Sequence, residues 1–327
     1  MASTSSSHSS SFRDNKRKLC TSCKVEPWQL LMKNSEEILQ FYLDHRILLP
    51  EKNCPSCGSV VKLNKASMTF RCDKTSVKKK TTKGQRCRWY ESGRKNSWLS
   101  GKHFDDKKLF AFVIFYLTMK PPRTAFLENF LKISRHTVVD WASFVREVLL
   151  FHCKELSVNK IGGRGRIVEI DEAKIGHWKY NRGRWIEGKW IFGGFERGRK
   201  LIFVVPVWNR STATLLRIIR KRIRPGTTIM SDRWASYRVL GQMTQFEHLT
   251  VNHSINFVDP DTGAHTNNIE RTWREVRANV PRYGPTSNHF SGYLAEFLFK
   301  RKYTDYSERI HEFYRSASML YDVFKVE

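Results

Sequence analysis

The sequence predicts an α/β fold for its C-terminal half, preceded by a helical segment and by a cysteine-rich one. Three observations support this prediction. Residues 166–208 contain three runs with the pattern of strands, punctuated by Gly, Arg and Asn as in an antiparallel meander. Residues 211–280 then alternate helical and strand patterns, whereas residues 104–153 are helical throughout. A chain of 327 residues is long enough for about two or three such domains.

The composition indicates a folded protein with a polyanionic partner. Hydrophobic residues make up 40% of the chain and aromatic residues 13%, which argues against a disordered protein. There are 58 Lys and Arg against 31 Asp and Glu, a formal net charge of +27. Nucleic acid is the partner that this charge favours, because neutralised phosphates release counterions. A ribosomal protein or a binder of anionic membranes would carry a similar charge.

The first 50 residues predict a leader and a short helix. Residues 1–33 start with a Ser-rich run, lack the apolar core of a signal peptide and include the basic patch 13–18, so we expect a disordered basic leader. A short helix is expected within residues 34–50. Asn34 or Ser35 can cap it, and apolar residues follow at helical spacing.

Neither a membrane span nor a disulfide framework is predicted. The most apolar run, Leu109–Met119, is about half the roughly 20 residues that a bilayer requires, so no membrane partner is expected. The seven cysteines are an odd number, and without a secretion signal they favour a reducing compartment with metal-bound or free thiols. Cys153 ends an apolar helix and is expected in the core. Cys20 and Cys23 form a CxxC pair with no evident partner pair, so metal binding there is left open.

A second CxxC pair predicts a zinc ribbon over residues 51–98. A turn of this kind aims two thiolates at one ion, and the runs SVVKL and SMTFR are expected to form a hairpin of short strands. The other two cysteines of this segment, Cys72 and Cys87, are separated by 14 residues instead of two. The alternative is a set of unpaired buried thiols. The predicted ligands of a structural Zn²⁺ are Cys54, Cys57, Cys72 and Cys87.

Residues 100–160 predict a helical domain with helix-turn-helix spacing. The first helix is stopped by two prolines at 121–122, and the short link Lys132–Ser134 joins the next two helices. In a helix-turn-helix the second of these helices enters a major groove of DNA. The alternative is a plain helical bundle. The candidate base or phosphate contacts at the start of the third helix are Arg135, His136 and Thr137.

Residues 163–303 predict a catalytic domain of mixed α/β order. Three antiparallel strands are followed by helix, strand, helix, strand and helix, an order that resembles the ribonuclease H-like fold. The expected strand between the last two of these helices has the sequence HLTVNHS. Residues 304–327 are expected to form a C-terminal helical tail.

Two aspartates stand where strands present ligands. Asp171 lies on the opposite face of its strand from Val168 and Ile170, and Asp232 ends the run TTIMSD. Ligands of α/β sheets gather at such strand ends. Together with a glutamate on a later helix, the two aspartates can share divalent cations. Hard oxygen ligands suit Mg²⁺ or Mn²⁺, and two such ions support phosphodiester chemistry.

Each acid also has an ordinary structural interpretation. Asp at a strand end is common as a turn former or helix cap. Glu169 and Glu172 compete with Asp171 as the ligand, and Glu275 competes with Glu270 on the later helix. Spacing alone leaves these alternatives open.

Three sequence blocks resemble the core motifs of the Merlin superfamily of cut-and-paste DNA transposases, relatives of a bacterial insertion-sequence group. The blocks are EIDEAKIG, SDRWASY and VDPDTGAHTNNIERTWREVRANVPRYG…YLAEFLFKRKY, of which the last is the most specific. The resemblance runs from about Cys54 to about Tyr303. It implies that Asp171, Asp232 and Glu270 are the catalytic, metal-binding triad, with 60 residues between the first two and 37 between the last two.

The resemblance implies a complete reaction cycle on double-stranded DNA. The enzyme would bind terminal inverted repeats through the ribbon and the helix-turn-helix, and would hydrolyse phosphodiesters at the element ends with two Mg²⁺ or Mn²⁺ ions. The freed 3′-hydroxyls would then attack target DNA without a covalent protein–DNA intermediate. Because two ends are joined in one assembly, a homodimer or higher oligomer is expected.

Further DNA contacts are expected from basic and aromatic residues. The run 176–190 predicts a hairpin that can lie beside a DNA end and stack on an unpaired base. The helix that carries Glu270 interleaves arginines with Trp273, which suits a DNA-facing surface. The alternatives are aromatics that pack the hairpin onto the sheet, a solvated basic face and a structural histidine at the helix start. The candidates are Trp178, Lys179, Arg182, Arg184, His265, Asn267, Arg271 and Arg274.

The sequence leaves two alternative functions open and suggests one cellular location. A retired transposase that serves as a DNA-binding regulator would keep the ribbon and the helix-turn-helix but lose metal-dependent cleavage. A ribonuclease H-like nuclease would cleave without strand transfer. The basic, Ser-rich leader fits a eukaryotic nuclear protein, although its basic runs are weak import signals.

Overall fold

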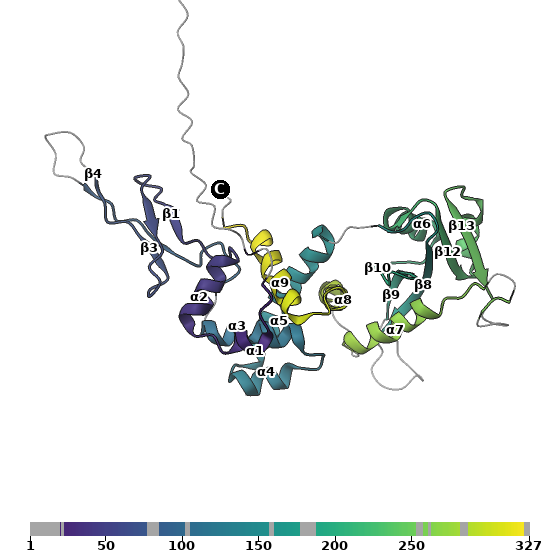
Figure 1. Cartoon of the computed structure of the whole chain (residues 1–327), viewed down its shortest axis with the longest axis horizontal. Coiled ribbons are helices and arrows are strands. Elements are labelled where there is room, and N and C mark those ends of the chain that lie inside the picture. The colour runs from purple at the N-terminus through teal and green to yellow at the C-terminus, as the bar shows by residue number, and fades with distance from the viewer. Residues whose placement is uncertain are drawn as a thin grey trace, which may run out of the picture.

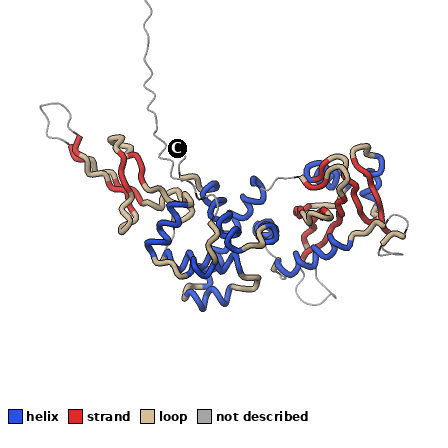
Figure 2. Tube along the Cα trace, viewed as in Figure 1, coloured by secondary structure: helices blue, strands red, loops and turns tan. Residues whose placement is uncertain are grey.

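The structure is a computed structural model that describes residues 20, 23–76, 85–101, 105–156, 160–176, 188–252, 258–260, 263–281 and 287–323. Three lobes follow one another along the molecule: a small β ribbon, a helical centre and an α/β lobe (Figure 1). Strands are confined to the two outer lobes (Figure 2). Among the helices of the described residues, none has the length and apolarity needed to cross a bilayer.

The ribbon lobe consists of three short antiparallel pairs. They are β1 (Glu51–Asn53) with β2 (Val60–Lys62), β3 (Thr69–Arg71) with β6 (Tyr90–Ser92), and β4 (Thr75–Ser76) with β5 (Gln85–Arg86). The expected hairpin between SVVKL and SMTFR is therefore replaced by other ladders. The CxxC turn reverses the chain so that β2 pairs with β1, and the two predicted strands share a bridge between Asn64 and Thr69.

The helical lobe gathers helices from both ends of the chain. They are α1 (Pro27–Leu31), α2 (Ser35–Asp44), α3 (Asp106–Thr118), α4 (Thr124–Leu131), α5 (Arg135–Phe151) with the π-helical turn His152–Leu156 after it, and α9 (Tyr306–Leu320). Asn34 caps α2 in a capping box with Glu37, and Ser134 caps α5. The short link before Ser134 turns through Lys132 in the left-handed region, with φ 51°.

Both predicted chain ends carry core residues, so the prediction of a disordered leader was wrong for its last residues, whereas the predicted helix at the C-terminal end is present. Within the predicted leader 1–33, α1 buries Leu30. The predicted tail contains α9, whose apolar residues recur at the spacing of one helix face and make it central to the lobe. Ile310, Phe313 and Tyr314 are each at most 1% exposed and belong to the core that also holds α3 and α5.

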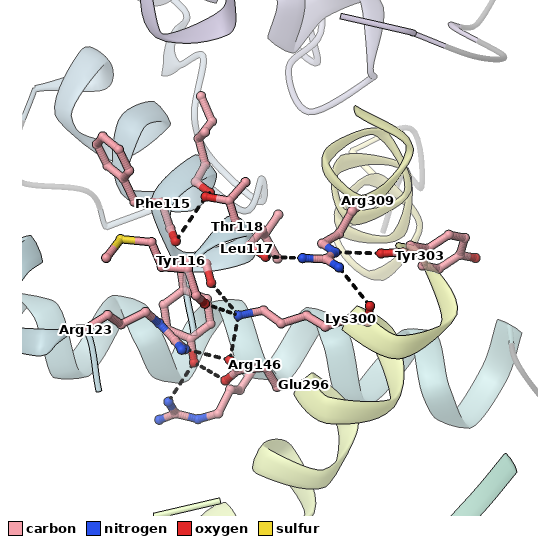
Figure 3. Close-up of polar contacts among 12 residues, drawn as sticks. Phe115, Tyr116, Leu117, Thr118, Arg123, Arg146, Glu296, Lys300, Tyr303 and Arg309 are labelled. Atoms are coloured by element: carbon pink, nitrogen blue, oxygen red, sulfur yellow. Dashed lines mark hydrogen bonds and ion pairs between the residues drawn. The ribbon is translucent and has the colours of Figure 1, made fainter. Parts of the chain in front are cut away.

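Helix α8 (Ser287–Lys302) packs against two cores at once. Phe290 and Phe297 face the α/β lobe, while Phe299 belongs to the helical core. At this junction Glu296 is 4% exposed and accepts hydrogen bonds from Tyr116 (2.7 Å), Arg123 (2.8 Å) and Lys300 (2.9 Å), as Figure 3 shows.

Those donors come from elements of the helical lobe and from α8 itself, and they satisfy a carboxylate that would be costly to bury alone. Arg309 of α9 adds bonds to the carbonyls of Leu117 and Lys300, each 2.8 Å long (Figure 3). The polar contacts therefore fix α8 at the boundary between the two lobes.

The α/β lobe is built on a five-stranded mixed sheet. Its strands are β8 (Ile167–Ile175), β9 (Lys189–Glu196), β10 (Ile202–Val207), β12 (Thr227–Asp232) and β13 (Phe246–Val251), in the order β10-β9-β8-β12-β13. The pairs β10–β9 and β9–β8 are antiparallel, whereas β8–β12 and β12–β13 are parallel. Beside the sheet, β7 (Ile161–Gly162) pairs in parallel with β11 (Ile223–Arg224).

Helices cover both faces of this sheet, so the predicted α/β class is confirmed. Val168 and Ile170 of β8 join the core under α6 (Thr212–Arg222) and the 3₁₀ helix η2 (Ala235–Gln242). Ala173 of β8 joins the core on the other face, under α7 (Asn267–Asn279) and α8. The alternation along β8 thus decides which of its acids face α7.

Candidate active site

The two predicted aspartates occupy matching positions on adjacent parallel strands. In the β8–β12 ladder Ile229 pairs with Val168 and Met230 pairs with Glu169. The same register, carried two residues further, aligns Asp232 with Asp171. Side chains at aligned positions of neighbouring strands point to the same face about 5 Å apart. The fold therefore brings these two carboxylates together on the side of the sheet that α7 covers.

Trp273 of α7 contacts Asp171 directly. Its indole Nε1–H donates a 2.8 Å hydrogen bond to Oδ2 of Asp171, and the ring is 3% exposed. Trp273 lies three residues after Glu270 on α7, and its indole is bonded to the first aspartate. The helix that carries Glu270 is thus bonded to the strand that carries Asp171.

Gly193 makes room for that contact. It pairs with Asp171 across the β8–β9 ladder. A Cβ at this position would lie 2.5 Å from Cη2 of Trp273 and 2.8 Å from the carbonyl oxygen of Phe203. A residue without a side chain is required here so that the indole can cross β9 to reach the aspartate.

Glu169, which is fully buried, anchors the start of α7. Its Oε2 accepts the backbone N–H groups of Asn268 (2.9 Å) and Ile269 (3.1 Å), and its Oε1 accepts Nδ2 of Asn268 (2.6 Å) and Nε of Arg197 (2.7 Å). A carboxylate at a helix N-terminus satisfies otherwise unpaired N–H groups and interacts favourably with the helix dipole. Glu169 is therefore a structural anchor, which removes it from competition with Asp171.

The turn before α7 is held from the same side. Gly263, with φ +67°, closes a turn in which Asp259 donates to the carbonyl of Ala264 (2.9 Å). Arg197 also donates to the carbonyl of His265 (3.0 Å). His265 is partly buried with Nδ1 3.5 Å from Glu169, and burial is the first cause that lowers its pKa. The polar run before the helix thus fixes where α7 begins.

Glu270 lies in the first turn of α7 and is partly buried. The hydroxyl of Thr266 donates to its Oε1 over 3.0 Å. Asn267, a candidate DNA contact, is exposed and lines a surface depression along α7 together with Glu270, Arg271 and Arg274. The oxygens of Asp171, Asp232 and Glu270 are not among the sets of three or more ligand atoms that converge within 4.8 Å in the described residues.

The two remaining competitors each have a partner of their own. Glu172 lies on the opposite face of the sheet, where its Oε2 accepts the hydroxyl of Tyr237 over 2.7 Å, and its Oε1 is buried without a hydrogen-bond partner among the described residues. Glu275 forms ion pairs with Arg301 and, at 3.8 Å, with Arg271. Glu275 is therefore committed to ion pairs, whereas Glu172 lies close enough to Asp171 and Asp232 for its charge to act on the pKa of Asp171.

Negative charge is concentrated around the two aspartates. The pKa of Asp171 is raised to about 7, first by burial and also by the charges of Glu172 and Asp232, against the hydrogen bond from Trp273, which lowers it. Burial also raises the pKa of Glu172, with the charge of Asp232 adding to it. Carboxylates gathered in this way favour a bound cation.

The four predicted zinc ligands come together in the ribbon lobe. The Sγ atoms of Cys54 and Cys87 are 3.5 Å apart, as are those of Cys57 and Cys72, and all four lie within 4.8 Å of one another. Such a set of thiolates could bind zinc. A second convergent group joins Cys20 and Cys23 to His45 and His311.

The residues predicted to contact DNA lie at the start of α5, on α7 and outside the described residues. Arg135 and His136 are exposed at the start of α5, and Thr137, which is partly buried, bonds the cap residue Ser134. Arg271 and Arg274 are exposed on α7. The residues of the predicted hairpin lie outside the described residues; they are Trp178, Lys179, Arg182 and Arg184.

Several residues near the site were missed by sequence reasoning. Arg210 lies between two indoles, 3.8 Å from the ring centre of Trp190 and 4.8 Å from that of Trp234, and Trp208 is 94% exposed after β10. Paired glycines in an apolar strand signal a close approach and could have identified Gly193. An acid flanked by apolar strand residues was the only signal for Glu169.

Comparison with known proteins decides the family. Residues 162–302 match the model of the ISXO2-like transposase domain. Over 96 residues the chain is 32% identical to an uncharacterized transposase-like protein of Haemophilus influenzae (strain ATCC 51907 / DSM 11121 / KW20 / Rd), covering 29% of this chain and 76% of that protein. This chain belongs to the ISXO2-like transposase family. Membership implies a nucleic-acid-processing enzyme that depends on divalent metal ions.

Two solved structures show weak similarity to this transposase. A structure of the simian T-cell lymphotropic virus intasome with PP2A regulatory subunit B56 gamma matches at TM-score 0.27 and 14% identity, over 52% of this chain and 66% of that chain. The Mos1 strand transfer complex matches at TM-score 0.19 and 12% identity, over 64% of this chain and 78% of that chain. Similarities at these scores carry no argument about fold or function.

Replacing Gly193 with Ala should displace Trp273 and weaken its bond to Asp171. Because the added carbon would lie 2.5 Å from the indole, we expect a loss of about 1–3 kcal/mol of unfolding free energy. Denaturant unfolding followed by tryptophan fluorescence measures it. Gly241→Ala is the matched control, since a Cβ there has nothing within 4 Å. Equal stability of the two variants would contradict the proposed close approach.

Glu169→Gln should loosen α7 from β8. The amide places donors against donors and leaves Arg197 without its anionic partner, so we expect a loss of about 2–4 kcal/mol. Thermal unfolding measures the loss. Glu275→Gln removes an exposed ion-pair partner and should cost less than about 1 kcal/mol. If Glu169→Gln were as stable as Glu275→Gln, Glu169 would not anchor the helix.

Asp171→Asn should stabilise the protein at pH 8 in buffer without divalent ions. The pKa of Asp171 is about 7 in the folded state and 3.8 ordinarily, so the folded state binds this proton more tightly than the unfolded state. The free energy of unfolding is therefore highest below pH 3.8 and falls as the pH rises to about 7. Asn keeps the acceptor for Trp273 and removes the buried charge. We expect the melting temperature to rise by about 2–5 °C at pH 8 and by less at pH 5. A gain that does not depend on pH would contradict the assignment.

Proposed function

We propose that this chain is a cut-and-paste DNA transposase of the Merlin superfamily with a ribonuclease H-like catalytic domain. The observation that carries the proposal is the β8–β12 register, which ends at the pair of Met230 with Glu169 and, continued by two residues, aligns Asp171 with Asp232 on the face covered by α7. The helix on that face carries Glu270 and is bonded to Asp171 through Trp273. The sheet, with three antiparallel strands followed by two parallel ones, supports the fold.

The carboxylates fit divalent metal ions. Their oxygens are hard ligands of the type that Mg²⁺ and Mn²⁺ prefer. The pKa of Asp171 is raised first by burial and then by the neighbouring carboxylates, and a bound cation would offset both effects. Asp171, Asp232 and Glu270 would hold the ions. When bound, such ions activate an attacking oxygen and stabilise a leaving oxygen at a phosphodiester.

The protein's own contribution is to hold these carboxylates in place. Trp273 orients Asp171 by its hydrogen bond, and the backbone N–H of Trp234 donates to Oδ1 of Asp232 over 3.1 Å. Glu169 fixes the start of α7, and with it the first turn that carries Glu270. Rigid support of this kind reduces the reorganisation needed during catalysis.

DNA recognition would use the basic surfaces around these acids. The net charge of +27 supports phosphate binding, and Arg271 and Arg274 project from the same helix as Glu270. The ribbon, with zinc on its four cysteines, and the exposed start of α5 would bind the terminal repeats. Trp208 and Arg210 add an exposed aromatic and a cation near β10 for contact with a DNA end. We also propose a homodimer or higher oligomer and a nuclear location.

Cleavage and strand transfer on labelled element-end DNA test the function. The wild type with Mg²⁺ or Mn²⁺ should cut the ends and join them to target DNA. Glu270→Gln should bind the ends but lose at least about 100-fold in both steps, because a metal ligand is removed. Glu275→Gln, five positions along the same helix, should retain both steps.

Three results would contradict the proposal. Binding without cutting or joining by the wild type with either metal would indicate a retired transposase that serves as a DNA-binding regulator. Cutting without joining would indicate a plain nuclease. Equal activity of Glu270→Gln and Glu275→Gln would remove Glu270 from the catalytic set.

A further inference from the structure

A second cluster of metal-ligating side chains lies at the edge of the helical core. Cys20 and Cys23 come from the segment before α1, His45 follows the last residue of α2, and His311 belongs to α9. Sγ of Cys23 is 2.9 Å from Nε2 of His45 and 3.0 Å from Nδ1 of His311, and Sγ of Cys20 is 3.8 Å from the same Nδ1. All four ligand atoms lie within 4.8 Å of one another.

The spacing of these atoms fits a tetrahedral ion. Zn–S bonds of about 2.3 Å and Zn–N bonds of about 2.0 Å give tetrahedral edges of about 3.3–3.8 Å. For a sulfur–nitrogen edge the value is about 3.5 Å. The three sulfur–nitrogen separations of 2.9, 3.0 and 3.8 Å lie on either side of it, so shifts of about 0.3–0.6 Å would complete the coordination. Two thiolates and two imidazoles are one of the common structural zinc sets, and the CxxC spacing is its usual first half.

His45 is also held as a neutral ligand would be. His45 is 5% exposed, and its Nδ1 lies 2.8 Å from the carbonyl oxygen of Phe41, which accepts the Nδ1 proton. That bond leaves the lone pair of Nε2 directed at Cys23. A hydrogen bond from the other ring nitrogen to a carbonyl oxygen is the outer contact that metal-binding histidines typically make. The His45 ring also stacks on Phe41 with centroids 3.9 Å apart. His311 is 4% exposed on the face of α9 that enters the core.

We propose that Cys20, Cys23, His45 and His311 form a second structural zinc site, separate from the four cysteines of the ribbon lobe. On binding, the two thiols lose their protons to solvent and the thiolates and imidazoles each give one lone pair to the ion. The ion crosslinks the chain between positions 288 residues apart. It fastens the N-terminal segment and the end of α2 to α9, and so closes the helical lobe at the side from which the ribbon lobe extends.

Metal content of the purified full-length protein tests the proposal. The wild type should contain two zinc ions per chain by elemental mass spectrometry. Cys57→Ser should lose one ion from the ribbon, and His311→Ala should lose the other. Cys153→Ser is the matched control and should keep both, because Cys153 belongs to neither cluster and contacts the carbonyl of Ala295. A wild type with one ion that Cys57→Ser removes would overturn the proposal.

A second measurement covers the case in which His311→Ala fails to fold. Co²⁺ added to metal-stripped Cys57→Ser protein should give the visible absorption of a tetrahedral site with two thiolates, because that chain keeps the N-terminal cluster intact. No such absorption would contradict the site. Thiol counting in denaturant after metal removal should find seven free thiols in the wild type. Five thiols, with the missing pair mapped to Cys20 and Cys23 by peptide mass spectrometry, would indicate a disulfide there instead and would also overturn the proposal.

Discussion

The α/β lobe depends on one buried carboxylate at the start of a helix. Glu169 is an acid inside an otherwise apolar strand, and its burial is tolerable only because four donors from α7 and Arg197 satisfy it. The same bonds hold the N-terminal end of α7 against β8. Asp171 lies two residues along that strand and Trp273 one turn along that helix, so the contact between them follows from the anchor.

The other lobes are joined to this one by shared elements. Helix α8 has apolar residues on two faces, and a buried, fully partnered Glu296 lies between them. Both faces of α8 are therefore buried only when both lobes pack against it. Helix α9 then returns to the N-terminal helices and brings His311 to the first CxxC pair. Both connections rely on groups that are costly to bury unless they are paired, which makes the arrangement specific.

The sequence identified most acids of the site but could not assign their roles. Alternation along β8 correctly separated Asp171 from its apolar neighbours, but Glu169 shares its face and only the contact with α7 marks it as an anchor. Glu172 and Glu275 were equal competitors by spacing. Tyr237 and Arg301, which engage them, lie 65 and 26 residues away. Pairings over such distances leave no periodic signal in a single sequence.

What the sequence determined by itself is what local chemistry encodes: the net positive charge, the α/β order, the CxxC turn of the ribbon with its four cysteines, and the acids at strand ends. The tertiary structure alone decided the ladders of the ribbon, the burial of α1 and α9, the space that Gly193 leaves for Trp273, and the partners of Cys20 and Cys23. The physical reason is that propensity and periodicity act over a few residues. Packing, by contrast, satisfies buried polar groups with whichever distant partners the fold brings near.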